Sequence, residues 1–309
     1  MTFAIEKVAV QLGEESIQVK DICKQTNQDY ERLILRSGFQ NVHRTKLDDL
    51  EFYSRFLQEH VELNGVDALL FVNQTMENLI PGGISKLLEY KQNTGQLFVL
   101  QISDGCSGFL KALLTAEGLF SSKKINRIVI ICAEKYSKFM NENNSNIHTI
   151  FSDAISMVQL KQSNEITIVD YSSENNFSSN EAIQTNPTKN NEITMEGSRV
   201  LKWTNSAVTK QVEELMKKNE IDFEMISGAF FHQGSKIVLE NLSENLGLQN
   251  LNLFRAAQYG NVVSSSIPFL LHDNYVNSGE YLPTGFSLLS AFGVGLTTIS
   301  MILKNGSEI

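Results

Sequence analysis

Short continuous apolar runs alternate along the chain with segments whose apolar residues recur every three or four positions. The runs predict buried strands, and the periodic segments predict amphipathic helices. Strands are expected at residues 8–12, 67–72, 97–102, 125–133, 151–160, 225–231, 286–291 and 296–303. Helices are expected within 17–38, where a glycine ends the helix, and at 47–64, after 83, from 109 onwards, and at 196–218, 237–246 and 264–277. This alternation predicts an α/β protein in which helices cover the sheets.

A pattern of strand, polar residue, glycine and helix occurs more than once. An Asp-Gly turn and Cys106 lie between strand 97–102 and its helix, and His232-Gln233-Gly234 follows strand 225–231 in the same way. Gly260-Asn261 precedes a third helix. The repetition suggests an internal duplication. We therefore expect two similar halves, residues 1–165 with the cysteine and residues 166–309 with the histidine and the asparagine.

Residues 172–191 differ in composition from the rest of the chain. They are rich in Asn and Ser and contain few apolar residues, so they offer little to a hydrophobic core. We predict a long exposed loop here. A linker between independent domains is less favoured, because the segment that follows is short and must pack against something.

Composition and charge narrow the class of protein. A net charge of −9 argues against nucleic acid as the main partner, although it leaves room for a local basic patch. The three cysteines have no metal-ligand spacing, which favours a reduced interior and no metal site. The sequence shows neither a signal peptide nor an apolar run of membrane-spanning length. We expect a soluble cytoplasmic protein with no membrane span.

Cys106 is the first candidate for chemistry. It lies where a strand passes into a helix, and the N-terminus of a helix favours an anion such as a thiolate. The thiolate is the nucleophilic form of cysteine. Flanking glycines allow a sharp turn and the close approach of a substrate. The alternative is a small buried core residue, which is how Cys23 and Cys132 are interpreted.

His232 and Asn261 are weaker candidates when taken alone. A histidine after a buried strand is more often a hydrogen-bonded structural residue than a catalyst. A Gly-Asn pair in a loop is usually a turn. Both interpretations stay open at this point.

Four short motifs resemble, in order and spacing, those of β-ketoacyl-acyl-carrier-protein synthase III, a condensing-enzyme branch of the thiolase superfamily. They are Asp104-Gly105-Cys106-Ser107-Gly108-Phe109, His232-Gln233, Gly260-Asn261 with Ser264-Ser265-Ser266-Ile267-Pro268, and Ala291-Phe292-Gly293-Val294-Gly295. The resemblance runs from about Val8 to Leu303.

The resemblance implies a thiolase-like five-layered αβαβα fold made of two duplicated halves, and a homodimer. It also implies a catalytic set of Cys106, His232 and Asn261. The thiolate would take an acyl group from a thioester. The histidine and the asparagine would stabilise the enolate that forms when a malonyl-type thioester loses CO₂. Backbone N–H groups of Cys106 and Val294 would form a second oxyanion hole.

The resemblance further implies that CoA or phosphopantetheine thioesters are substrates, carried as acyl-CoA or on acyl-carrier protein, with no tightly bound cofactor and no metal. Arg36 matches a family arginine at the substrate entrance. Arg32 stands where members have an aromatic residue that stacks on adenine, and an arginine can also lie on adenine or pair with phosphate. The carrier-docking arginine is replaced by Ile237, with Lys236 beside it.

Other substrate-binding positions carry further departures from the family. Gly293 matches, but the pocket wall near Ile80 differs, and the stretch 151–155 lacks its usual glycines. These changes favour a specialised lipid, secondary-metabolite or surface-polysaccharide pathway over the starter step of fatty acid biosynthesis. Two alternatives stay open: acyl transfer from Cys106 to an alcohol, amine or sugar without decarboxylation, and a non-catalytic partner subunit.

Overall fold

The computed structural model describes residues 2–76, 83–89, 96–122, 124–140, 145–176, 178, 182–186, 192–293 and 295–306. The strands are β1 (Thr2–Leu12), β2 (Glu15–Gln18), β3 (Asn41–Arg44), β4 (Ala68–Val72), β5 (Phe98–Ile102), β6 (Arg127–Glu134), β7 (Ala154–Gln162), β8 (Ile166–Asn175), β9 (Ile183–Asn186), β10 (Glu192–Met195), β11 (Ile226–Phe231), β12 (Gly285–Gly293) and β13 (Thr297–Asn305). The α-helices are α1 (Val19–Gln25), α2 (Tyr30–Ser37), α3 (Asp49–His60), α4 (Gly83–Leu88), α5 (Gly108–Phe120), α6 (Ser145–His148), α7 (Gly197–Lys218), α8 (Lys236–Asn245) and α9 (Ser266–Ser278). Short 3₁₀ helices include η1 (Gly105–Ser107), η2 (Tyr136–Phe139) and η6 (Val263–Ser265).

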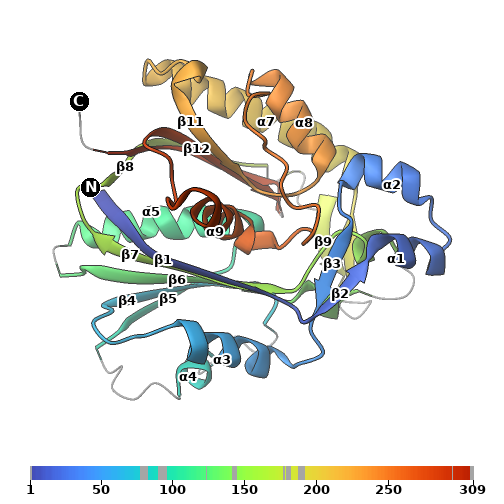
Figure 1. Ribbon diagram of the computed structural model, residues 1–309, viewed down its shortest axis with the longest axis horizontal. Coiled ribbons are helices and arrows are strands. Elements are labelled where there is room, and N and C mark those ends of the chain that lie inside the picture. The colour runs from blue at the N-terminus through green and yellow to red at the C-terminus, as the bar shows by residue number, and fades with distance from the viewer. Residues whose placement is uncertain are drawn as a thin grey trace.

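Five layers stack on one another (Figure 1). Helices α3 and α4 cover one face of the strands β1 and β4–β7, and α5 and α9 lie on the other face. The strands β8 and β11–β13 follow, and α7 and α8 cover their outer side. The central helices are apolar on most sides because they are buried between two sheets. This is the αβαβα arrangement that the resemblance implies, so the predicted fold class is confirmed.

The two groups of strands repeat one topology. Along β4-β6-β7-β1 the pairings are parallel, antiparallel and antiparallel, and the same series runs along β11-β12-β13-β8. A short antiparallel pairing of β1 with β8 joins them into one nine-stranded sheet. Each group also has a central helix that begins after a 3₁₀ turn, η1 before α5 and η6 before α9. We propose that these groups are the two duplicated halves, divided at residues 165 and 166.

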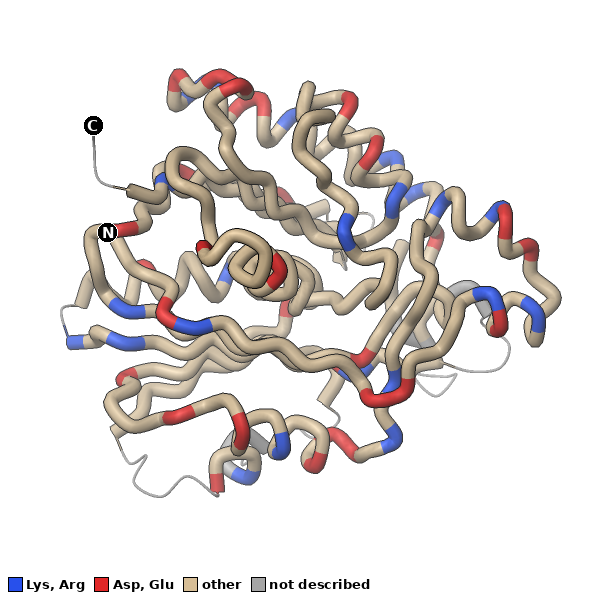
Figure 2. Tube along the Cα trace, viewed as in Figure 1, with Lys and Arg blue, Asp and Glu red and all other residues tan. Residues whose placement is uncertain are grey.

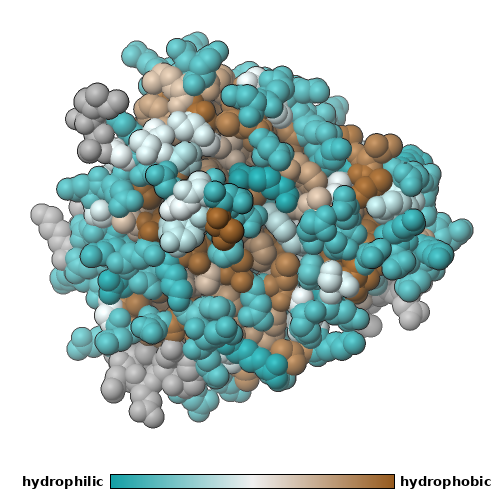
Figure 3. All heavy atoms as spheres, viewed as in Figure 1, coloured by the Kyte–Doolittle hydropathy of each residue, from teal (hydrophilic) through white to brown (hydrophobic). Residues whose placement is uncertain are grey.

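Charged side chains gather on the outer helices and loops, whereas the middle of the strands is almost uncharged (Figure 2). On the same face, hydrophobic atoms gather towards the centre, over the end of α9 (Figure 3). Tyr275 and Val276 of α9 are exposed. The pattern is that of ordinary amphipathic elements around a buried core.

Most predicted elements are confirmed, and the first difference is the segment 17–38. The segment 17–38 holds a short strand and two helices, because Asn27 has φ +54° and Asp29 accepts a hydrogen bond from the Arg32 N–H as the N-cap of α2. Gly38 ends α2 in a left-handed conformation, as predicted.

Strand β5 is the second difference. Its continuous apolar run predicted a strand buried on both faces, but β5 lies at the edge of the sheet. Phe98 is 45% exposed and Val99 is 39% exposed. The prediction of burial is therefore wrong for the single chain, because an apolar run does not reveal which surface covers it.

Candidate active site

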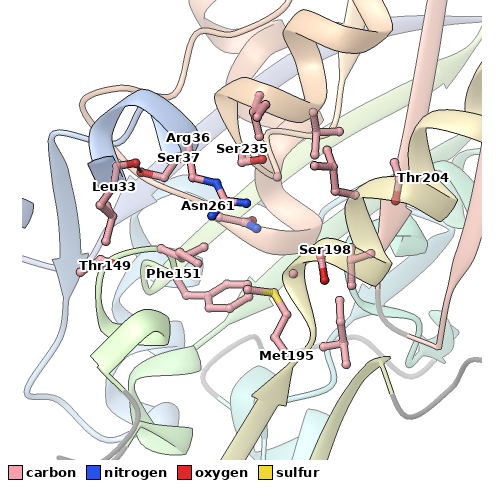
Figure 4. Close-up of a pocket in the computed structure, with 18 of the residues that line it drawn as sticks. Leu33, Arg36, Ser37, Thr149, Phe151, Met195, Ser198, Thr204, Ser235 and Asn261 are labelled. Carbon is pink, nitrogen blue, oxygen red and sulfur yellow. Dashed lines mark hydrogen bonds between the residues drawn. The ribbon is translucent and has the colours of Figure 1, made fainter. Parts of the chain in front are cut away.

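One cavity of about 610 Å³ brings the predicted catalytic residues together. Cys106, His232 and Asn261 all line it, although they come from segments far apart in the chain. Figure 4 shows Arg36 of α2 on one side of the cavity and Thr204 of α7 on the other, with Asn261 between them. Both halves therefore contribute to a single site.

Cys106 lies in the turn of residues 104–107, here called the nucleophile turn, between β5 and α5. It is only 6% exposed. Gly105 has φ +46°, and a Cβ at this position would lie 2.8 Å from the Gln74 Nε2 atom. The dipole at the start of α5 favours negative charge at this position.

Gly293, at the end of β12, lies directly against the cysteine. A Cβ added to Gly293 would come within 2.7 Å of the Cys106 Sγ atom. A side chain there would displace the thiol, which explains why this predicted substrate-binding position is a glycine.

His232 follows β11 and is fixed on several sides. Its backbone N–H donates to the Ser290 carbonyl at 2.8 Å, its Nδ1 lies 3.0 Å from the Ser266 Oγ, and its ring meets the edge of Phe292. Burial lowers the pKa of His232 to about 3, and a hydrogen bond with the backbone of Val263 acts in the opposite direction. The imidazole is therefore neutral at physiological pH.

Asn261 belongs to residues 260–265, here called the oxyanion turn. Its backbone N–H donates to the Ile150 carbonyl at 2.8 Å, and its carbonyl accepts from the Ser152 N–H at 2.9 Å. Its side-chain Oδ1 accepts from the Val263 N–H at 2.9 Å. Because the oxygen is engaged in this way, the amide NH₂ is the group that can donate to a substrate.

Some of the predicted substrate-binding residues line the cavity and others do not. Arg32 and Arg36, both exposed on α2, line the cavity, and Ile237 of α8 does so too. Lys236 is not among the described residues that line it, and its ammonium lies 3.5 Å from Glu240. Ile80 and Val294 lie outside the described residues.

The predicted loop at 172–191 is wrong in two places. Strand β8 continues to Asn175, and β9 pairs with β10 in an antiparallel hairpin. Ile183 and Met195 of this hairpin line the cavity, and Ile193 packs in the same cluster as Cys106. Backbone pairing stabilises such strands without a long apolar run. The isolated isoleucines in a polar stretch were the available signal.

Phe151 also lines the cavity, and no role was predicted for it. It stacks on Tyr136 at 4.7 Å and lines the cavity beside the cysteine. In the described part of the chain, no three His, Cys, Asp or Glu side chains are grouped to hold a metal ion. Among the same residues, no helix is both long and apolar enough to cross a membrane.

Two family profiles match the chain. The profile described as 3-oxoacyl-[acyl-carrier-protein (ACP)] synthase III matches residues 100–176, and the profile of its C-terminal part matches residues 216–305. Together they span more than half of the chain and include all three proposed catalytic residues.

Comparison with individual proteins indicates the same family over nearly the whole length of the chain. The β-ketoacyl-[acyl-carrier-protein] synthase III of Lactococcus lactis subsp. cremoris is 26% identical over 326 residues, covering 98% of this chain and 100% of the relative. The structure of the 3-oxoacyl-(acyl carrier protein) synthase III of Pseudomonas aeruginosa PAO1 matches with a TM-score of 0.87 at 17% identity, covering 100% of both chains. The priming β-ketosynthase of the R1128 polyketide pathway matches with a TM-score of 0.83 at 18% identity, covering 99% of this chain and 97% of that one. The chain therefore belongs to the 3-oxoacyl-acyl-carrier-protein synthase III family of thiolase-superfamily condensing enzymes and is an acyltransferase of that type.

Proposed function

We propose that this condensing enzyme transfers an acyl group from a thioester to Cys106 and then joins it to a decarboxylated malonyl-type thioester. The observation that carries the proposal is one cavity lined by a cysteine at a helix N-terminus, a neutral histidine and an asparagine whose oxygen is already engaged. The helix N-terminus favours a thiolate, and the neutral imidazole and the amide NH₂ are both able to donate hydrogen bonds.

In the first half-reaction, the thiolate attacks the thioester carbonyl. The new carbon–sulfur bond forms as the bond to the donor sulfur breaks, and the CoA or phosphopantetheine thiol leaves with a proton. We assign the oxyanion hole of this step to the backbone N–H groups of Cys106 and Val294. The exchange of one thioester for another leaves a reactive acyl group on the enzyme.

In the second half-reaction, the malonyl-type thioester loses CO₂, and the electron pair of the broken bond forms an enolate. His232 and Asn261 donate hydrogen bonds to its oxygen. The Ser266 hydroxyl donates to Nδ1 in this scheme, which leaves the imidazole proton on Nε2. The enolate carbon then attacks the acyl-cysteine, and the thiolate leaves. The product is a β-ketoacyl thioester.

The experiment combines two measurements on the purified protein. Mass spectrometry after incubation with a panel of acyl-CoAs and acyl-carrier proteins identifies the acyl group on Cys106. Labelled malonyl thioesters then show whether CO₂ is released with product. Turnover without CO₂ would overturn the proposal in favour of acyl transfer to an alcohol, amine or sugar. An enzyme that is never acylated would favour a non-catalytic partner subunit.

The proposed substrate donor is an acyl-carrier protein or acyl-CoA. Arg32 and Arg36 line the cavity, and Arg199 and Lys202 of α7 and Lys236 of α8 add further positive charge. These residues would attract phosphates or an acidic carrier to an otherwise acidic protein. We also propose a specialised biosynthetic pathway in the cytoplasm, because Arg32, Ile237 and the stretch 151–155 depart from the family pattern.

We also propose a homodimer in which β5 lies at the two-fold axis. The strand is at the edge of the sheet, and its Phe98 and Val99 are exposed, which makes it ready to pair with a second copy. Light scattering at micromolar concentration should give a dimer for the wild type and a monomer for Val99→Lys. A wild-type monomer would contradict the proposal.

A further inference from the structure

Glu134, the last residue of β6, is a carboxyl group that the proposed mechanism does not use. Its side chain is fully buried. A buried carboxyl is unfavourable unless hydrogen bonds compensate for the loss of water. The partners of Glu134 therefore indicate what it does.

The two carboxyl oxygens of Glu134 contact different segments of the site. The Ser264 hydroxyl in the oxyanion turn donates to Oε1 at 3.2 Å. The Gln74 backbone N–H donates to Oε2 at 3.3 Å, and the Thr75 hydroxyl also hydrogen-bonds the carboxyl. The side chain of Gln74 packs against Gly105, next to the nucleophile. Glu134 thus bridges the oxyanion turn and the segment that supports the nucleophile turn.

The oxyanion turn needs such support. Val263 is β-branched yet has φ +53°, a conformation that side chains with a Cβ rarely adopt and that surrounding contacts must hold in place. The next three residues each anchor it through a hydroxyl. Ser264 bonds Glu134, Ser265 donates to the Cys132 carbonyl at 3.1 Å, and Ser266 meets His232.

We propose that Glu134 is a positioning residue that sets the placement of the oxyanion turn relative to the nucleophile turn. The proposal rests on the proposed function, because it assigns the enolate to the oxyanion turn. It predicts that loss of the bridge affects the step that uses Asn261 more than the acylation of Cys106.

The positioning role of Glu134 should give CO₂ release a characteristic pH dependence, because the carboxyl changes its protonation state near neutral pH. Burial raises the pKa of Glu134 to about 8, while its hydrogen bonds and the positive charge of Lys138 act in the opposite direction. The other titratable groups that feel its charge are Tyr53, Cys132 and Tyr136, and burial raises the pKa of each of them. Near pH 8, ionisation of Glu134 places a negative charge beside the oxyanion turn and opposes the enolate.

The first experiment compares Glu134→Gln, Glu134→Leu and the exposed control Glu213→Gln at pH 7. Glutamine keeps the shape and the hydrogen-bonding capacity, so product formation should stay within about threefold of the wild type. Leucine removes the bridge, and the release of CO₂ should fall by about 10²-fold, as for a misplaced oxyanion donor, while Cys106 is still acylated. Equal loss in the Gln and Leu variants, or no loss in the Leu variant, would overturn the proposal.

The second experiment measures CO₂ release from the pre-acylated enzyme between pH 6 and 9.5. Cys106 carries an acyl group in this state and does not titrate. The wild-type rate should fall as the pH rises through about 8, and Glu134→Gln should lack this alkaline limb. A limb that is the same in both proteins would contradict the role of Glu134.

A third measurement does not depend on the reaction. Amide hydrogen exchange of Val263 and Ser264 should be about tenfold faster or more in Glu134→Leu than in Glu134→Gln, because the turn loses its anchor. If exchange responds as expected but neither protein releases CO₂, the positioning role stands and the proposed function fails. If exchange is unchanged, the bridge itself is refuted.

Discussion

The nucleophile turn and the oxyanion turn have similar backbone geometry, but different interactions stabilise them. Each leads through a 3₁₀ turn into a central helix, and each contains a residue with positive φ. In the first, that residue is Gly105 at +46°, which adopts the conformation without strain. The second contains Gly260 at +69° and also Val263 at +53°, for which the conformation is strained by roughly 1–3 kcal/mol. The first turn depends on its own sequence, and the second depends on tertiary contacts.

The difference matches the work proposed for each turn. The nucleophile needs room, and Gly293 leaves space for the Cys106 thiol while Gly105 leaves space for the side chain of Gln74. Oxyanion donors need fixed positions. The hydrogen bonds of Ser264 and Ser265 with β6, and of Ser266 with His232, provide them. Mutations should therefore affect the two turns at different steps.

The largest expected effect comes from removing the nucleophile. Cys106→Ala should abolish the acyl mass addition, because no other group at the helix N-terminus can form the thioester. Cys23→Ala and Cys132→Ala are matched controls, since both are buried core cysteines, and should still be acylated. Intact-mass spectrometry decides the matter, and acylation that persists without Cys106 would refute its role.

Removing a donor from the oxyanion site should have the next largest effect. His232→Ala and Asn261→Ala should each lower condensation by about 10²–10³-fold, the usual result of losing one preorganised donor. Acylation of Cys106 should be spared, and the release of CO₂ should fall in parallel with condensation. Single-turnover assays separate the steps. Near-normal turnover of Asn261→Ala would favour the non-decarboxylating alternative.

A smaller effect is expected from changing the glycine of the nucleophile turn. Gly105→Ala should lower the free energy of unfolding and slow acylation, because its Cβ would meet Gln74 as well as strain the backbone. Gly247→Ala is the matched control, since Gly247 also has positive φ but nothing lies within 4 Å of its Cβ. The control should cost about 1–2 kcal/mol by strain alone. Urea denaturation of both variants measures the difference, and equal destabilisation would refute the packing argument.

The smallest expected effect concerns the pH dependence of the reaction, in which we expect no contribution from protonation of His232 between pH 7 and 5. Because burial lowers the pKa of His232 to about 3, the imidazole stays neutral as the pH falls from 7 to 5. The stability that neutral His232 contributes is present above its unfolded pKa of about 6.5 and is lost as the pH falls towards 3. CO₂ release from the acyl-enzyme should therefore show no acid limb near 6.5. A limb there that vanishes in His232→Gln would indicate a general base instead.

Much of the protein could be predicted from local pattern. The strands β4 and β6 hold continuous apolar runs, and β11 and β12 are mostly apolar with isolated serines, so this local pattern predicts them without tertiary information. The family resemblance on the four motifs gave the five layers and the family, both of which are confirmed. Cys106, His232 and Asn261 line one cavity. Their catalytic roles stay a prediction.

Other features were decided only when the chain folded. Backbone pairing and the packing of Ile183 and Ile193 near Cys106 position the hairpin of β9 and β10. The polar composition of this stretch does not indicate either interaction. The edge position of β5 depends on strand order, which apolarity does not specify. Glu134 looks like any acidic residue in the sequence. Its burial, raised pKa and contacts with the oxyanion turn and with Gln74 arise because the end of β6 packs against both segments, and such environments are set by residues distant in sequence.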